Sequence, residues 1–261
     1  MRRRTLATLL AGALSIMLVM PPAVAAKVIH HGARTAPVVA LTFDDGWSPA
    51  RVREILAILV RNKVPATFFP YANAMRRSPA TWRAVAAAGY PVGNHTVSHP
   101  RLTTLSATAI RYQICGFRGV ADDLLGRPSI AWFRPPYGRW NPLVARIAAS
   151  CGYQHVVLWD VDSRDWTGES PLAITVRASA GGDGSIVLMH AGPANTPLAL
   201  QGVIDAYRAR GFDFVTIPEL LGGTLPAETA GSEPAAITTS GGDRGQDVDW
   251  SIWNRRFPIV D

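Results

Sequence analysis

The sequence is poor in cysteine and in lysine. Its 261 residues include two cysteines, which excludes a small scaffold held together by several disulfides. Cys115 and Cys151 either form one disulfide, which export would permit, or remain two buried thiols on neighbouring helices. Only Lys27 and Lys63 are lysines among the 26 basic residues, a bias that we attribute to codon composition.

Two motifs are also absent. The sequence has no G-x-S-x-G elbow, which argues against a serine hydrolase. It has no basic stretch interleaved with aromatic residues, so we expect no nucleic-acid partner.

Apolar and positively charged residues are abundant by contrast. Hydrophobic residues make up 48% of the chain, enough for a sizeable core, and this excludes a wholly disordered protein. The formal net charge is +7, and residues 27–223 hold 20 basic and 13 acidic side chains. A basic balance favours an anionic partner without naming one. We interpret it as attraction to an anionic cell envelope.

Residues 1–26 have the pattern of a secretory signal peptide. Three arginines at positions 2–4 precede an apolar run over residues 6–20, and the small residues 23–26 provide a cleavage site. The alternative is an uncleaved anchor, but the run is shorter than the roughly 20 apolar residues that span a bilayer. No later segment is apolar enough to cross a membrane. The pattern therefore predicts a secreted or cell-wall-associated protein with no stable membrane insertion after cleavage.

Residues 27–223 alternate between short apolar runs and amphipathic segments of helical period. The apolar runs predict about seven strands, at residues 38–43, 66–71, 91–93, 130–133, 155–161, 185–189 and 212–217. The amphipathic segments predict helices at residues 49–62, 78–89, 106–125, from 141, from 171 and at 197–210. This alternation favours a parallel α/β fold, either an open doubly wound sheet or a closed barrel.

The C-terminal region has a different composition. Residues 224–246 are rich in Ala, Thr, Ser, Gly and Pro, which predicts a flexible linker. We therefore interpret residues 224–261 as a linker and an aromatic tail. The tail residues Trp250, Trp253 and Phe257 either dock on the domain or bind something else.

Polar residues gather where the expected strands end. The carboxyl ends of parallel strands share one face of an α/β fold, and active sites lie at that face. The sequence therefore predicts a crevice that collects these side chains: Asp44, Asp45, His95, His99, Arg134, Asp160, Asp162, Asp165, Trp166 and His190.

The histidines and adjacent aspartates have the spacing of a metal site. His95 and His99 are four residues apart, so both imidazoles can face one way on a helical turn. Two histidines and a carboxylate from another segment bind a divalent metal and leave positions open. Asp44 and Asp45 point in different directions, so one can bind metal while the other takes a proton. The alternatives are structural histidines and a solvated acidic turn.

Two further ionisable residues end apolar segments. Arg134 needs a partner for its charge there, and a carboxylate of the aspartate set is the obvious candidate. His190 is either a general acid or a structural histidine.

Five motifs occur in a characteristic order, at residues 42–46 (TFDDG), 95–99 (HTVSH), 134–137 (RPPY), 162–166 (DSRDW) and 188–190 (LMH). Together they resemble the polysaccharide deacetylase family, carbohydrate esterase family four. The resemblance covers about residues 36–221 and is specific because all five motifs are present. It implies a distorted (β/α) barrel with fewer than eight units, which agrees with the expected number of strands.

The resemblance also implies roles for the metal and the general base. Asp45, His95 and His99 would bind a divalent metal, usually zinc, although cobalt or another ion would also fit. Asp44 would be the general base, oriented by an ion pair with Arg134.

Other matched residues would complete the site. His190 would be the general acid, tuned by Asp165, with Asp162 a further group near the site. The backbone N–H of Tyr137 would help to hold the oxyanion. The remaining residues assigned to substrate are Trp166 and Leu188, which would line a pocket for the acetyl methyl, and Pro136 beside Tyr137.

The resulting hypothesis is a secreted, monomeric, metal-dependent deacetylase, with residues 27–223 as its catalytic domain. It would hydrolyse N-acetyl groups of a polysaccharide containing N-acetylglucosamine, either cell-wall peptidoglycan or a chitin-like polymer. The metal would polarise the amide carbonyl and acidify a water molecule. Two alternatives remain: an O-acetyl esterase acting on xylan or wall glycan, and an inactive wall-binding domain.

Overall fold

The computed structural model describes residues 25–222. The strands in this part of the chain are β1 (Lys27–Ile29), β2 (Val38–Asp45), β3 (Thr67–Pro70), β4 (Trp132–Phe133), β5 (His155–Val157), β6 (Val161–Asp162), β7 (Ser185–His190) and β8 (Asp213–Phe214). The α-helices are α1 (Pro49–Asn62), α2 (Ala72–Arg77), α3 (Pro79–Ala87), α4 (Ala107–Leu125), α5 (Pro142–Ser150), α6 (Pro171–Ala178), α7 (Asn195–Ala209) and α8 (Ile217–Leu220). Short 3-10 helices are η1 (Leu102–Thr104), η2 (Pro136–Gly138) and η3 (Asp165–Thr167).

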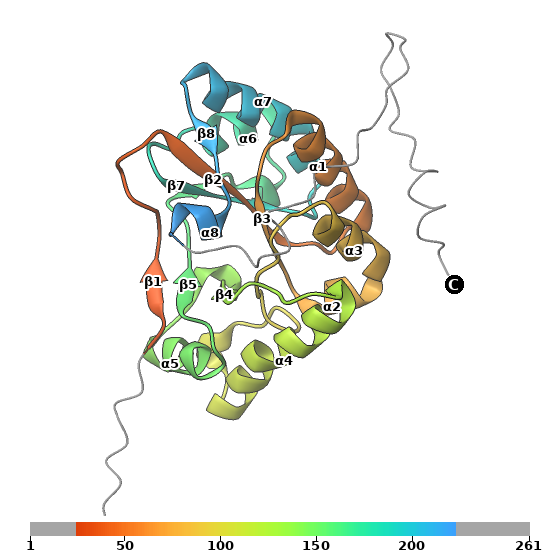
Figure 1. Ribbon diagram of the computed structural model, residues 1–261, viewed down its shortest axis with the longest axis vertical. Helices are drawn as coiled ribbons and strands as arrows, with labels where there is room; N and C mark the ends of the chain where they lie inside the picture. The colour runs from red at the N-terminus through yellow and green to blue at the C-terminus, as the bar shows by residue number, and fades with distance from the viewer. Residues whose placement is uncertain (1–24, 223–261) are drawn as a thin grey trace, which may run out of the picture.

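The strands form two parallel sheets around a common interior (Figure 1). One sheet has the order β1-β5-β4, and the other has the order β3-β2-β7-β6 with β8 paired to the start of β2. Isolated bridges between Phe68 and Val92 and between Asn94 and Phe133 connect β3 to β4. On the opposite side, the chain passes directly from β5, which pairs with β4, to β6, which pairs with β7. The fold is therefore the predicted α/β distorted barrel rather than an open sheet.

Several elements differ from those predicted. Residues 91–93 form isolated bridges instead of a strand, because Pro91 has no N–H to donate to a ladder. The strand expected at residues 155–161 is divided into β5 and β6, because its halves pair with different neighbours. The last expected strand is shortened to β8, and its final residue begins α8. The sequence pattern predicts neither β1 nor α2, since three and six residues are too few to show a period.

Alternation along β2 and β7 determines which side chains face the interior. Ala40 of β2 and Ile186 of β7 belong to an apolar cluster inside the barrel, together with residues of β1, β3, β4 and β5. The outward side chains of β2 pack in a second cluster with surrounding helices: Val39, Leu41 and Phe43. Side chains two residues apart share a face of a strand. The inward residues nearest the strand ends are therefore Thr42 and Asp44 on β2, and Leu188 and His190 on β7.

The described chain begins within the expected signal peptide. Ala26 is buried, and its N–H donates to the carbonyl of Ala145 at 3.1 Å, so it packs as part of the domain. The predictions for residues 1–24 and 223–261 lie outside the described residues. Within residues 25–222, no helix is long and apolar enough to cross a bilayer.

Candidate active site

Asp44 and His190 end neighbouring strands and are direct partners in the ladder. Asp44 of β2 pairs with His190 of β7, and Thr42 pairs with Leu188 two positions earlier. Neighbouring strands lie about 4.8 Å apart, and both side chains are on the inward face. A carboxylate and an imidazole are thus held side by side where the strands end, as the strand-end argument predicts.

Arg134 is fully buried beneath Asp44 and connects three strands. Its Nη1 donates to Asp44 Oδ1 and to Thr42 Oγ1, both at 2.7 Å. Its Nε and Nη2 donate to the carbonyls of Val157 and Leu158, at 3.1 and 3.2 Å. The carboxylate partner expected for this buried charge is therefore Asp44. Burial raises the pKa of Asp44 and the guanidinium opposes that rise, which leaves a carboxylate more basic than an exposed one.

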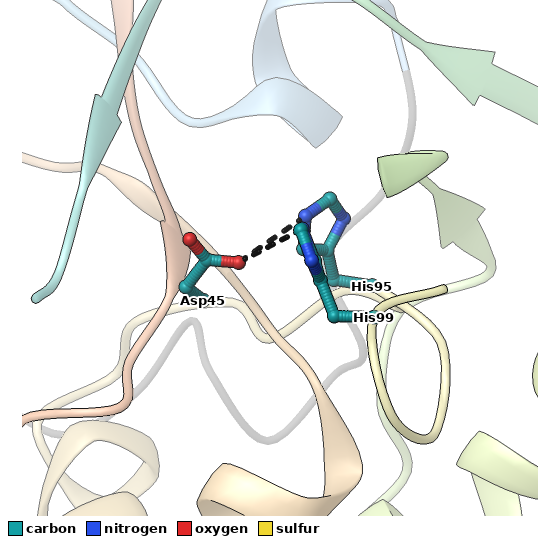
Figure 2. Close-up of side chains that lie close together, drawn as sticks. All are labelled: Asp45, His95 and His99. Carbon is teal, nitrogen blue, oxygen red and sulfur yellow. Dashed lines mark ion pairs between the residues drawn. The ribbon is translucent and has the colours of Figure 1, made fainter. Parts of the chain in front are cut away.

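Asp45 faces His95 and His99 (Figure 2). Its φ of 71° lies in the left-handed region, which redirects the chain immediately after β2. Its Oδ1 lies 3.2 Å from His99 Nε2 and 3.6 Å from His95 Nε2. This buried oxygen has no hydrogen-bond partner among the described residues. Unpaired buried oxygens are rare, and an unseen ion is one of their ordinary explanations.

The donor atoms of this group fit a divalent cation. His95 Nδ1 lies 2.7 Å from the carbonyl of Arg134, so Nδ1 carries the proton and the Nε2 lone pair faces Asp45. Tetrahedral zinc with bonds of about 2.0–2.1 Å needs donors about 3.4 Å apart, close to the two separations above. Burial lowers the pKa of both histidines to about 3, which keeps them neutral as ligands must be. Burial also raises the pKa of Asp45 to about 7, and the nearby charge of Asp44 adds to that rise.

The loop that carries the two histidines is not the expected helical turn. Thr96 and His99 have φ values of 72° and 62°, so local backbone turns, not helical periodicity, bring the imidazoles together. Asn94 supports the loop by accepting from the Thr96 N–H at 2.7 Å and donating to the Ile114 carbonyl at 2.8 Å. Gln113 Oε1 accepts the next two backbone N–H groups, of Val97 and Ser98, at 3.0 Å each.

A disulfide restrains α4, the helix to which this loop is hydrogen-bonded. Cys115 of α4 is bonded to Cys151, which caps the C-terminus of α5. The structure thus selects the disulfide from the two alternatives that the sequence leaves open. Cys115 directly follows Gln113 and Ile114, the residues that hold the histidine loop.

His190 has a dedicated carboxylate partner. Asp165 is fully buried; its Oδ1 lies 2.7 Å from His190 Nδ1, and its Oδ2 accepts from the His190 N–H at 2.7 Å. Thr196 donates to the same Oδ2 at 2.6 Å. Burial lowers the pKa of His190, but the hydrogen bond and charge of Asp165 outweigh it and raise the pKa to about 9. Asp162 takes no part in this pair: it is exposed and accepts from the Arg164 N–H at 2.9 Å.

An open cleft of about 780 Å³ leads from the metal donors to the surface. Tyr137 forms one side of it, with φ of 59°, an exposed side chain and its ring 4.7 Å from that of His99. A smaller cleft of about 290 Å³ is also lined by Tyr137. The remaining predicted substrate residues are placed separately: Pro136 and Leu188 are buried, and Trp166 is exposed beside Asp165.

The cleft is also lined by Ser98 of the motif at residues 95–99, and by residues that the sequence did not single out: Trp47, Tyr71, Asn73, Arg76 and Arg77. Most of them follow β3, whose end lies at the same face as those of β2 and β7. The apolar strand at residues 66–71 was the available signal, because the residues after it had to reach this face. Thr42, which bonds Arg134, lies in the motif at residues 42–46 but was assigned no role, and Thr196, which bonds Asp165, lies outside all five motifs.

Comparison with known proteins gives consistent matches. A family model described as polysaccharide deacetylase matches residues 31–156. The chitooligosaccharide deacetylase of Sinorhizobium fredii is 34% identical over 208 residues, which cover 74% of this chain and 96% of that protein. The peptidoglycan-N-acetylglucosamine deacetylase PgdA of Listeria monocytogenes is 34% identical over 194 residues, which cover 74% of this chain. The match spans 41% of the length of PgdA.

A solved structure agrees with these relatives. The family 4 carbohydrate esterase from Streptomyces lividans, in complex with acetate, has a TM-score of 0.64 and 34% identity to this chain. The match covers 70% of this chain and 93% of that one.

Proposed function

Because the chain belongs to the polysaccharide deacetylase family, we propose that it removes N-acetyl groups from a polysaccharide containing N-acetylglucosamine. The products would be acetate and a free amine on the sugar. One observation carries the proposal: a buried carboxylate paired with Arg134 and an imidazole paired with Asp165 are ladder partners beside a set of metal donors. The activities for which the relatives are named, on chitooligosaccharide and on peptidoglycan, support this class of substrate.

Asp45, His95 and His99 would hold a divalent cation, and we propose zinc. When bound, such an ion supplies a Lewis acid that polarises a carbonyl and lowers the pKa of a water molecule. The unpaired Oδ1 of Asp45 and the tautomer of His95, whose Nδ1 donates to the Arg134 carbonyl, support this assignment.

Asp44 and His190 would move the protons. Asp44 would accept the proton of the attacking water, while Arg134 holds its carboxylate in position. His190 would protonate the departing nitrogen, because Asp165 keeps its imidazole charged up to about pH 9. The Tyr137 N–H would donate to the oxyanion that develops on the carbonyl oxygen. Leu188 and Trp166 would contact the acetyl methyl.

We further propose that the protein is exported and acts at the cell wall. The signal-like pattern of residues 1–26 and the excess of basic residues support export and envelope binding. The Cys115–Cys151 disulfide supports the same proposal, since such bonds persist in oxidising compartments.

Acetate release from chitooligomers and from acetylated xylan tests the proposal. We expect release from the chitooligomers, its loss after chelation, and its return with added zinc. Asp44→Asn should lower kcat about 10²–10⁴-fold through loss of the base while zinc binding by equilibrium dialysis stays intact. Thermal unfolding of the variant controls for its fold.

Each contrary result has a distinct meaning. Release from acetylated xylan alone would replace N-deacetylation with ester hydrolysis. Full activity after complete zinc removal would overturn the metal assignment. No release from either substrate by folded, zinc-loaded protein would favour the inactive wall-binding alternative.

A further inference from the structure

Helix α2 brings two arginines to the cleft that holds the metal donors. Arg76 and Arg77 form the last turn of α2, soon after β3, and both line the cleft together with Asp45 and His99. Both side chains are exposed. The guanidinium groups therefore belong to the same open space as the proposed reaction centre.

Neither guanidinium is paired with a carboxylate among the described residues. Arg76 Nη1 donates to the amide oxygen of Asn73 at 3.1 Å. Arg77 Nη2 donates to the Tyr71 hydroxyl at 2.6 Å and stacks on that ring with its Cζ 5.7 Å from the centroid. These neutral contacts fix the direction of each group without neutralising its charge. Most of the five N–H donors of each guanidinium remain available.

The surroundings of the cleft add positive charge rather than compensate it. Arg101 stacks over Tyr137, with its Cζ 5.4 Å from the ring centroid. Asp45 is the one acidic residue among the described residues that line the cleft, and it faces the two histidines. A cleft with an excess of positive charge concentrates anionic ligands.

We propose that Arg76 and Arg77 form a subsite for a carboxylate on the substrate glycan, carried by a sugar next to the N-acetylated unit. The inference rests on the proposed function and narrows its substrate class from any N-acetylated glycan to an anionic one. A guanidinium matches the two oxygens of a carboxylate with parallel N–H donors. We place the carboxylate on the glycan because Arg76, Arg77 and the metal donors share one cleft, so a single glycan chain reaches both the arginines and the metal donors.

Two soluble chitin derivatives provide the test, since they share a backbone and differ in the charge of the substituent. Carboxymethyl chitin is anionic, and glycol chitin is neutral. We expect the zinc-loaded protein to have a higher kcat/KM on the carboxymethyl polymer, by about tenfold, with the preference falling as salt is added. The double substitution Arg76→Gln/Arg77→Gln should lower the ratio of the two kcat/KM values about tenfold.

Arg83→Gln/Arg146→Gln is the matched control. It removes the same charge from two exposed arginines that do not line the cleft, so the ratio should not change. A general loss of structure in the α2 double variant would lower both rates and leave the ratio unmoved. The ratio therefore reports recognition of the carboxylate and not stability.

The outcomes separate the two proposals. Equal kcat/KM on both polymers, or a preference that survives Arg76→Gln/Arg77→Gln, would overturn the subsite while deacetylation stands. No acetate from either polymer or from chitooligomers would overturn the proposed function itself. A ratio that falls only in the α2 variant supports the assignment.

Discussion

The candidate site has a polar floor at the strand ends and an exposed rim, and the two are built on different principles. The floor comprises Asp44, Arg134, Asp165 and His190, whose side chains hydrogen-bond to one another or to neighbouring residues. The rim comprises the exposed cleft residues Trp47, Arg76, Arg77 and Tyr137, together with Trp166, which follows Asp165 in the chain; the exposed fractions of its three aromatic side chains are 44% to 59%. Floor residues lie at the ends of barrel strands or bond directly to them, whereas rim residues lie on the loops and short helices that follow.

Because of this difference, we expect the floor to determine the chemistry and the rim to determine the choice of substrate. A floor residue cannot be replaced without leaving a buried partner unpaired, which is costly in an interior of low dielectric constant. A rim residue exchanges contacts with water at little cost, so its changes alter binding and leave the fold intact. The contrast predicts large, coupled losses of stability and activity at the floor, and small losses at the rim.

The largest effect is expected for Arg134→Met. This substitution leaves Asp44 buried without its partner and removes the donors to the carbonyls of Val157 and Leu158. The free energy of unfolding, measured with urea, should fall by about 3–5 kcal/mol. The matched variant Arg139→Met, at an exposed arginine five residues later, should change it by less than about 1 kcal/mol. Similar values for both variants would remove the distinction between floor and rim.

A smaller effect is expected for Asp165→Asn, which tests the pairing of Asp165 with His190 in the metal-free protein. The pKa of His190 is raised from 6.5 to about 9 in the folded state. A raised histidine pKa stabilises the fold fully below pH 6.5, and this contribution disappears as the pH rises through 9. The loss over that window amounts to about 3 kcal/mol.

The variant should move the NMR titration midpoint of His190 to lower pH and reduce the pH dependence of unfolding between 6.5 and 9. Asp162→Asn removes an exposed carboxylate from the same segment and serves as the control. An unchanged midpoint in Asp165→Asn, or an equal shift in both variants, would contradict the assigned pairing.

The smallest effect on stability is expected for Trp166→Ala at the rim. Because Trp166 is 59% exposed, the free energy of unfolding should change by less than about 1 kcal/mol. The KM for chitooligomers should rise several-fold through loss of an aromatic contact worth about 1 kcal/mol. Trp82→Ala, at a tryptophan that is 1% exposed, should instead cost about 3–5 kcal/mol in stability.

The floor was predictable from the sequence because its residues end apolar segments. Asp44, Arg134 and His190 each follow a run of buried residues, and parallel strands bring such ends to one face. Alternating strands and helices likewise predicted a parallel α/β fold, and the family resemblance carried by the five motifs chose the barrel over an open sheet. The five motifs then distinguished a deacetylase site from a chance collection of charges.

The remaining features of the site could not be predicted from the sequence, because they depend on short or irregular stretches of backbone and on how helices pack. The loop over residues 95–99 has the spacing of a helical turn, but positive φ at Thr96 and His99 produces the same proximity by another route. Helix α2 is only six residues long, so no periodicity revealed that Arg76 and Arg77 reach the cleft. Whether Cys115 and Cys151 meet depends on how α4 packs on α5, which neither segment encodes alone.

The position of the disulfide has a thermodynamic consequence for ion binding. Cys115 is adjacent in sequence to the two residues of α4 that hold the histidine loop, so the covalent bond and the ligand geometry share one support. Coupling between two such equilibria is reciprocal. By whatever factor oxidation of the thiols would tighten binding of the proposed cation, that cation would favour the oxidised pair by the same factor. The redox state of the two cysteines and occupancy of the proposed cation site would therefore both report on the same support, helix α4.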